Sequence, residues 1–274
     1  MESFASSRFL AKKKVAILLS GHLRNFEQII NNFKNNFIKE ISTEFDYDIY
    51  IHTWDNNFTR DKIMNHDTHF LDIKVNNNYI YNLFQKNGLS VKKIIIENQK
   101  ELYNSLNINS YLNTNINGRS IHDKFDIDYV KDLTNKLFWQ YYGHYKLINN
   151  LDNIDEYDFI IKSRPDIFYD KFDRKLFEHD IFFPETHQYE GVNINQIFFG
   201  GKTKYMTEIL HFFQNFIFYN KIINFPVIDN YHKTDINFNR IFRYYIMNIL
   251  KYNPVFIKYN PKIYRSNGNF ETIK

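Results

Sequence analysis

The chain has 274 residues, of which 43% are hydrophobic and 24% charged, with a formal net charge of +4 and no cysteine. This length and hydrophobic content suffice for one substantial core. The lack of cysteine excludes a disulfide scaffold, a cysteine–zinc site and thiol catalysis, and it fits a reducing compartment such as the cytoplasm.

The N-terminal residues are polar and basic. Only five apolar residues follow Lys14, which is too few for a signal peptide, and no stretch approaches the roughly 18 to 20 apolar residues of a membrane span. A nucleic-acid binder would concentrate its basic residues, whereas only 12–14 form a run here. We therefore expect no nucleic-acid partner, a flexible tail over 1–13 and a single domain over 14–274; weak contact with an anionic membrane surface stays open.

The first half of the chain alternates strand and helix patterns. Residues 15–19 are an apolar run of strand length, and apolar side chains then recur at helical spacing over 26–37, with Asn25 and Gln28 placed as a capping pair. The alternation continues with a strand over 48–54, a short helix over 79–84 and a strand over 91–96. Such units predict a largely parallel sheet.

The second half begins with an Asn- and Ser-rich stretch, 104–119, which we expect to be a long surface loop or lid. One broad apolar face over 130–151 then predicts a central packing helix. The remaining elements, in order, are strands over 157–161, 181–183 and 194–199, helices over 205–219 and 236–250, and a strand over 255–259. The predicted fold is α/β, with a mostly parallel, Rossmann-type central sheet flanked by helices.

Polar clusters follow two of these strands. Ser20-Gly21-His22-Leu-Arg24 ends the first, where a glycine permits a tight turn and the N–H groups at the start of the next helix attract phosphate. His52-Thr-Trp54-Asp ends the second, where Trp54 can pack against a base or a sugar and His52 can bind a ribose. A plain turn and ordinary core packing explain these residues as well, but the carboxyl edge of a parallel sheet is where ligands bind.

A third cluster, Lys162-Ser-Arg164-Pro-Asp166, follows a later strand. Asp166 can ligate Mg²⁺ or Mn²⁺, and the two basic residues can contact phosphate oxygens. The Asp-x-Asp sequences at 46–48 and 126–128 also look like metal motifs, but they lie at the opposite edge, where roles at a strand start and a helix cap are favoured.

Taken in order, Leu19-Ser-Gly-His-Leu-Arg24, Asp48-Ile-Tyr-Ile-His-Thr-Trp54, Ile161-Lys-Ser-Arg-Pro-Asp166 and Asn195-Gln-Ile-Phe-Phe-Gly200 resemble a family of GT-A-like glycosyltransferases. These are enzymes of capsule and lipopolysaccharide synthesis and of giant viruses, with patterns Ser-Gly-x-x-Arg, His-Thr-Trp, Arg-x-Arg-x-Asp and Asn-Asp-Gln-Phe-x-x-Gly. The resemblance covers about residues 15 to 270. Two positions differ, because Lys162 replaces an arginine and Asn195-Gln196 replaces Asp-Gln.

The resemblance implies transfer of a sugar from a nucleotide donor such as a UDP-sugar to a glycan or another hydroxyl acceptor. It implies donor contacts from the first two clusters and from Lys162, Arg164, Asn195 and Gln196, and a manganese or magnesium ion at Asp166. Glu190 and Asp235 are our candidates for the catalytic base. The expected location is the cytoplasm, or for a viral protein the host cytoplasm or the virion. The alternative is a non-catalytic module that binds a nucleotide or a glycan on the same fold.

Overall fold

The structure is a computed structural model. It describes residues 12–55, 75–98, 101–102, 105, 139–185, 194, 196–215, 242–259, 261–264 and 270–272. Within them, seven strands form one sheet in the order β3-β2-β1-β4-β7-β6-β8. These strands are β1 (Lys14–Ser20), β2 (Asp46–Trp54), β3 (Lys93–Glu97), β4 (Phe159–Ser163), β6 (Ile181–Pro184), β7 (Phe199–Lys202) and β8 (Val255–Ile257).

The sheet is mixed but mostly parallel. The pairs β1–β2, β2–β3, β1–β4 and β6–β8 are parallel, and β7 runs antiparallel between β4 and β6. A second, antiparallel sheet has the order β10-β9-β5, formed by β10 (Phe270–Thr272), β9 (Lys262–Tyr264) and β5 (Ile167–Phe168). The predicted α/β class with a largely parallel sheet is confirmed at this level.

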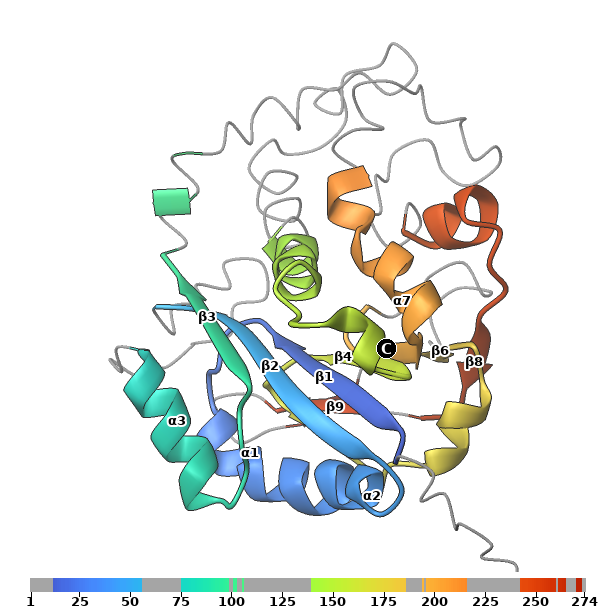
Figure 1. Cartoon of the computed structure of the whole chain (residues 1–274). Coiled ribbons are helices and arrows are strands. Elements are labelled where there is room, and N and C mark those ends of the chain that lie inside the picture. The colour runs from blue at the N-terminus through green and yellow to red at the C-terminus, as the bar shows by residue number, and fades with distance from the viewer. Residues whose placement is uncertain are drawn as a thin grey trace, which may run out of the picture.

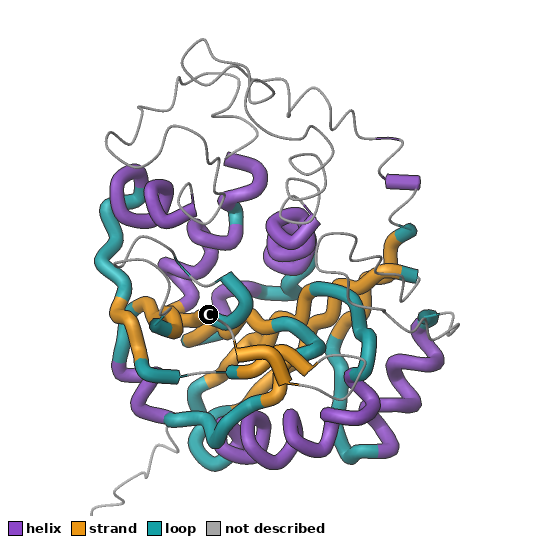
Figure 2. The backbone as a smooth tube through the Cα atoms, turned by 180° about the vertical axis from the view of Figure 1, so that it is seen from behind, coloured by secondary structure: helices purple, strands orange, loops and turns teal. Residues whose placement is uncertain are grey.

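Helices cover both faces of the main sheet (Figures 1 and 2). On one face lie α1 (Phe26–Asn32), η1 (Phe33–Ile38), α2 (Lys39–Ser42) and α3 (Asn77–Lys86). On the other lie the helical residues 139–148, α7 (Thr203–Leu210) and the helical turns over 242–249, which include η5 (Tyr245–Ile249). Two short 3₁₀ helices lie along the same part of the chain: η3 (Ile154–Glu156) precedes β4, and η4 (Arg174–Glu178) precedes β6.

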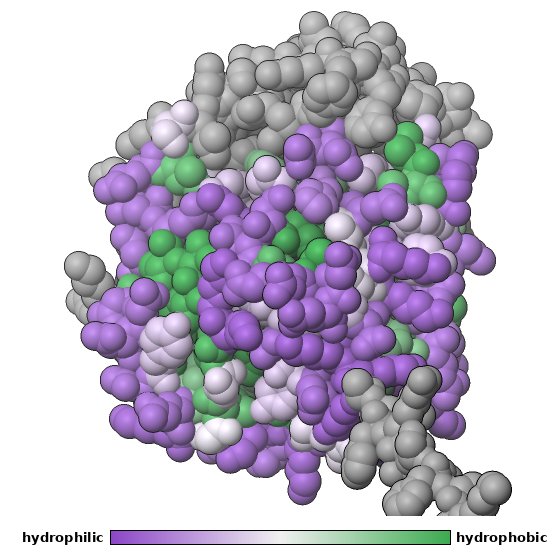
Figure 3. All heavy atoms as spheres, in the orientation of Figure 1, coloured by the Kyte–Doolittle hydropathy of each residue, from purple (hydrophilic) through white to green (hydrophobic). Residues whose placement is uncertain are grey.

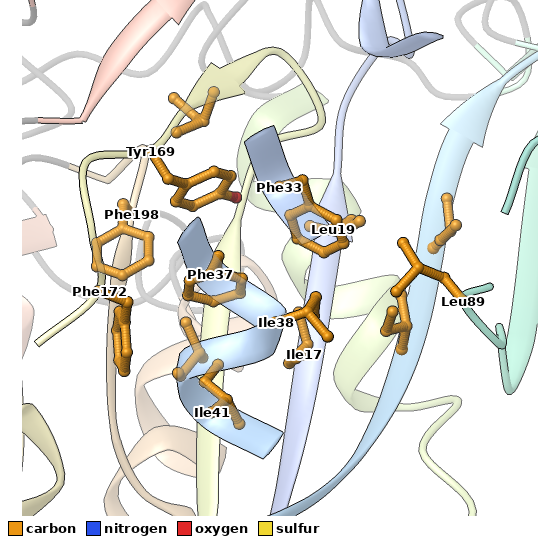
Figure 4. Packing of buried hydrophobic residues seen from close by; sticks show 14 of the residues in the cluster. Ile17, Leu19, Phe33, Phe37, Ile38, Ile41, Leu89, Tyr169, Phe172 and Phe198 are labelled. Atoms are coloured by element: carbon orange, nitrogen blue, oxygen red, sulfur yellow. The ribbon is translucent and has the colours of Figure 1, made fainter. Parts of the chain in front are cut away.

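Alternation along the strands divides the hydrophobic residues into two cores. In β1, Ile17 and Leu19 belong to the core beneath α1 and η1, whereas Ala16 and Leu18 belong to the core beneath residues 139–148. Figure 4 shows the first core, in which Phe33 and Phe37 of η1 reach the sheet. The ring of Phe37 stacks on Tyr169 at 4.6 Å. Both sheet faces are therefore buried, as a parallel sheet requires.

One predicted strand is shifted. We expected 194–199 to be a strand that ends at a glycine pair, but β7 begins at Phe199 and contains Gly200 and Gly201. A Cβ at Gly200 would lie 2.9 Å from the Ile160 carbonyl oxygen, and one at Gly201 would lie 2.2 Å from that of Asp180. These glycines allow β7 to fit closely among its neighbours, so they are part of the strand and do not end it.

Several other expectations lie partly or wholly outside the described residues. These are the tail over 1–11, the loop over 104–119 except Ser105, the Asp-x-Asp sequence at 126–128, and the segments 130–138, 216–219 and 236–241 of predicted helices. The predicted single domain over 14–274 stays a prediction.

The amino edge of the sheet holds a polar network without a ligand role. The ammonium of Lys14 lies 2.9 Å from the Asp48 carboxylate, which also accepts a 2.8 Å hydrogen bond from the Tyr157 hydroxyl. Asp46 begins β2. Both aspartates thus occupy the strand-start positions that we expected.

The described surface in Figure 3 is mainly hydrophilic, with separate apolar areas. Tyr81 and Val255 are its exposed large hydrophobic residues. Within the described parts of the chain, no helix has both the length and the apolar character needed to span a bilayer.

Candidate functional site

The three polar clusters meet at the carboxyl edge of neighbouring strands. Parallel pairing aligns Ser20 of β1 with His52 of β2, and Leu19 with Ser163 of β4. The residues that follow each strand therefore lie side by side. Register in a sheet with two buried faces is strongly fixed by its hydrophobic residues, so this alignment follows from the apolar runs.

The turn after β1 is tight, as expected. Gly21 has φ +132°, and its backbone N–H donates to the carbonyl oxygen of His52 at 3.1 Å. Arg24 has φ +40°, an uncommon conformation for a residue other than glycine that is often found at functional sites. The predicted capping pair is wrong, because the Asn25 side chain makes no capping hydrogen bond. The first turn of the helix is instead closed by a backbone hydrogen bond, which the Gln28 N–H donates to the Asn25 carbonyl oxygen.

Arg24 and Arg164 converge on Asp166. Arg164 donates from Nε to Oδ1 at 2.8 Å and from Nη2 to Oδ2 at 2.5 Å, and Arg24 donates from Nη1 to Oδ2 at 2.9 Å. The carboxylate is 1% exposed, whereas the side chains of Arg24 and Arg164 are 23% and 19% exposed. The arginine side chains are therefore the more exposed members of the cluster, and the carboxylate is the buried one.

The segment that carries Asp166 is held from both sides. The Tyr264 backbone N–H of β9 donates to the Asp166 carbonyl oxygen at 2.9 Å, and β9 pairs with β5 directly after it. On the other side, Asn32 and Asn36 of the α1–η1 run donate to the carbonyl oxygen of Tyr169 at 2.9 and 3.0 Å. The carboxylate consequently has a fixed backbone on which to hold the arginines.

We expected Asp166 to bind a metal, and its surroundings do not fit one. Both carboxylate oxygens already accept hydrogen bonds from guanidinium groups, so a cation would have to displace an arginine. Among the described residues, no group of three or more His, Asp or Glu side chains is placed to hold a metal ion. Divalent cations are bound by several oxygen ligands, and the described residues around Asp166 do not supply such a set.

The end of β2 carries a second polar network. His52 is completely buried, and its Nε2 lies 2.8 Å from the Glu97 carboxylate at the end of β3. Glu97 also accepts a 2.9 Å hydrogen bond from the Tyr142 hydroxyl and lies 3.0 Å from the Lys146 ammonium. Burial would raise the pKa of Glu97, but hydrogen bonds from His52 and Lys146 outweigh burial and lower the pKa to about 2.

Sequence reasoning missed Glu97 and its two partners in the predicted helix, Tyr142 and Lys146. Glu97 directly follows the predicted strand over 91–96, so the rule that selected the other strand ends would have selected it too. Tyr142 and Lys146 are four residues apart in the predicted helix and therefore share a face. Because Glu97 is ionised, His52 Nε2 donates to it and Nδ1 is the acceptor nitrogen; burial lowers the pKa of His52.

Trp54 is part of the core beneath residues 139–148. It is 3% exposed, packs edge-on against Trp139 at 5.4 Å and stacks with Tyr142 at 6.3 Å. The half-buried His22 lies 6.3 Å from its ring. His52 and Trp54 thus make the contacts of buried core residues, which is the packing role that the sequence left open for them.

Lys162 connects two of the predicted motifs. Its ammonium is completely buried and donates to the Gln196 carbonyl oxygen at 2.6 Å. Burial lowers its pKa far below the usual value. Gln196 is itself buried, while Asn195, Glu190 and Asp235 lie outside the described residues. The structure therefore joins Lys162 to the segment before β7 through the backbone carbonyl oxygen of Gln196.

No family model and no curated protein sequence matches the chain. The solved structures that resemble it include two crystal structures of the glycosyltransferase GlyE of Streptococcus pneumoniae TIGR4, both at low similarity. One of these is the apo form; the TM-scores are 0.39 for the apo form and 0.37 for the other, each at 9% sequence identity. Each alignment covers 89% of this chain and 45% of the GlyE chain, so the chain spans about half the length of the proteins it resembles. This likeness is too distant to assign a site or an activity.

Proposed function

We propose that the chain is a glycosyltransferase that uses a nucleotide-sugar donor and a hydroxyl acceptor such as a glycan. The observation that carries the proposal is the convergence of Arg24 and Arg164, from two separate sequence motifs, on one buried carboxylate at the carboxyl edge of β1 and β4. Such an edge is the usual ligand site of α/β sheets, and paired guanidinium groups are suited to phosphate. The order of the motifs along the chain supports the same function.

The chemistry explains the need for positive charge. In the proposed transfer, the bond between the anomeric carbon and the diphosphate oxygen breaks, and its electron pair leaves with the diphosphate. The acceptor oxygen forms the new glycosidic bond and gives its proton to a base, for which Glu190 and Asp235 stay our candidates. Cationic groups that are already in position stabilise the growing negative charge on the diphosphate without reorganisation.

The residues at the end of β2 have a supporting role in this proposal. His52 and Trp54 are buried, so they support the sheet edge from the interior: His52 hydrogen-bonds to Glu97, and Trp54 stacks with Tyr142. Gly21 and His22, both half-buried, lie on the surface side of the same turn. We therefore propose donor contacts from Ser20 to Arg24 and from Arg164, and, as the resemblance implies, from Asn195 and Gln196.

The test is a panel of UDP-, GDP-, TDP- and CMP-sugars, with thermal unfolding and sugar release measured on the same samples. A ligand at about 100 times its Kd stabilises the fold by about 2.7 kcal/mol, which raises the melting temperature by several degrees. We expect one nucleotide to give this shift and its sugar to be transferred or slowly hydrolysed. A panel with no shift contradicts the proposal. A shift with neither hydrolysis nor transfer to any offered acceptor identifies the alternative, a non-catalytic binding module.

A further inference from the structure

We propose that Arg24 and Arg164 take the place of the divalent cation in this chain, so that a nucleoside diphosphate binds without metal and Asp166 is a positioning residue for the two arginines. The inference rests on the proposed function and deepens it, because it names the groups that recognise the phosphates.

The charges at the cluster support this assignment. Two guanidinium groups share one carboxylate, so these three groups together carry a net positive charge. The Asp166 side chain is 1% exposed, whereas the Arg24 and Arg164 side chains are 23% and 19% exposed. An anion that approaches the sheet edge therefore meets the arginines before it meets Asp166.

The hydrogen-bond geometry gives Asp166 a task other than metal binding. Arg164 contacts both of its oxygens in a two-point arrangement, and Arg24 adds a contact to Oδ2. Arginine held in this way keeps a fixed planar fork, which matches the oxygens of a phosphate better than a flexible ammonium does. The carboxylate thus orients two cations from the segments that follow β1 and β4.

The supporting backbone makes the arrangement rigid. Asp166 is bonded to β9 through its carbonyl oxygen, and three residues earlier the Ser163 hydroxyl lies 2.5 Å from the Tyr169 hydroxyl. For Asp166 to serve as a metal ligand, it would have to release at least one arginine contact within this frame. The left-handed backbone of Arg24 is a second sign that the turn is built to place this side chain.

The experiment measures binding of UDP, GDP and TDP by calorimetry, in EDTA and then in Mn²⁺. We expect one of them to bind in EDTA, with a Kd within about threefold of the value in Mn²⁺. Arg24→Gln and Arg164→Gln should each weaken binding in EDTA by about tenfold or more, since each removes a charge-assisted contact to phosphate. Asp166→Asn should weaken it in EDTA too, because the arginines lose their anchor.

Two variants serve as controls. Arg174→Gln removes an arginine that pairs with Glu44 on the surface, and Asp48→Asn removes a paired carboxylate at the opposite edge of the sheet. Both should leave the Kd unchanged. Circular dichroism identifies any variant that does not fold; the two arginine variants test the proposal even if Asp166→Asn is one of these.

The remaining outcomes separate this inference from the proposed function. Binding that requires Mn²⁺, and that Asp166→Asn abolishes while Arg24→Gln leaves it intact, overturns the inference and leaves the proposed function standing. Failure of all nucleotides to bind in either condition, when the sugar panel also gives no shift, overturns both.

Discussion

Gly143 is where the helical residues 139–148 come closest to the sheet. A Cβ at this position would lie 2.2 Å from the Ser20 hydroxyl oxygen and 3.0 Å from His52 Nδ1. On either side of it in the helix, Tyr142 contacts Glu97 and His144 packs edge-on near Phe199. The glycine therefore allows polar groups of the helix and of three strands to share one buried layer.

Gly143→Ala should destabilise the protein by about 1 kcal/mol, although alanine favours a helix over glycine by a similar amount. The reason is the clash with Ser20, so Ser20→Ala should remove most of the cost. A double-mutant cycle from urea unfolding measures this coupling. If the two changes are additive, the close contact is not what selects glycine here.

At the scale of elements, Lys162 fastens β4 to the segment before β7. Its ammonium donates to Gln196 O at 2.6 Å from a completely buried position, where the charged form is disfavoured. Arginine, which the Arg-x-Arg-x-Asp pattern would place here, cannot give up its proton, whereas the pKa of a buried lysine shifts readily. Lysine is therefore the basic residue that suits this interior position.

Lys162→Arg should therefore lower the melting temperature more than Lys162→Met. Methionine leaves a carbonyl oxygen without its donor, at a cost of about 1 to 3 kcal/mol, whereas arginine forces a permanent charge and additional volume into the core, at a cost of several kcal/mol. Thermal unfolding of the two variants at pH 7.5 gives the order. An arginine variant as stable as the wild type would show that this position tolerates a charge.

The elements that sequence could predict are those with a strong local pattern. The apolar run of β1 and the spacing of Phe26 to Phe37 predicted a strand and a helix, and both are present. The predicted position of the antiparallel β7 was wrong because its glycines look locally like the end of a strand. Their actual role depends on residues distant in the chain, Ile160 and Asp180.

The candidate site shows the same limit. Sequence predicted that the clusters after β1, β2 and β4 would meet, since parallel strands align their ends. It could not predict that Asp166 would face two arginines, because the pairing with Arg24 spans 142 positions of the chain and depends on side-chain direction. Asn32 and Asn36, in a chain so rich in asparagine, became informative only through their bonds to Tyr169.

At the scale of the whole molecule, the two sheet faces differ in character. The core beneath α1 and η1 encloses the Ser163–Tyr169 hydroxyl pair, whereas the core beneath residues 139–148 encloses the basic side chains of His52, His144 and Lys162 near the carboxyl edge. Among the described residues, Nε2 of His144 and Nδ1 of His52 have no hydrogen-bond partner. Burial lowers the pKa of both histidines, and the proximity of Lys162 lowers that of His144 further.

These buried histidines make stability depend on pH in a defined direction. In the unfolded chain, histidine takes up a proton near pH 6.5, whereas in the folded protein both side chains stay neutral to lower pH. Their contribution is therefore fully present above about pH 7 and is lost as the pH falls below about 6.5, by up to about 1.4 kcal/mol per pH unit for each histidine.

His144→Leu should flatten the pH dependence of the unfolding free energy between pH 6 and 5 by about that amount, whatever its effect on stability at pH 7.5. His179→Gln, which changes a half-buried residue at the end of η4, is the control and should keep the wild-type slope. Urea unfolding at several pH values measures both slopes. Equal slopes for His144→Leu and the wild type would mean that His144 is protonated as easily in the fold as in the unfolded chain.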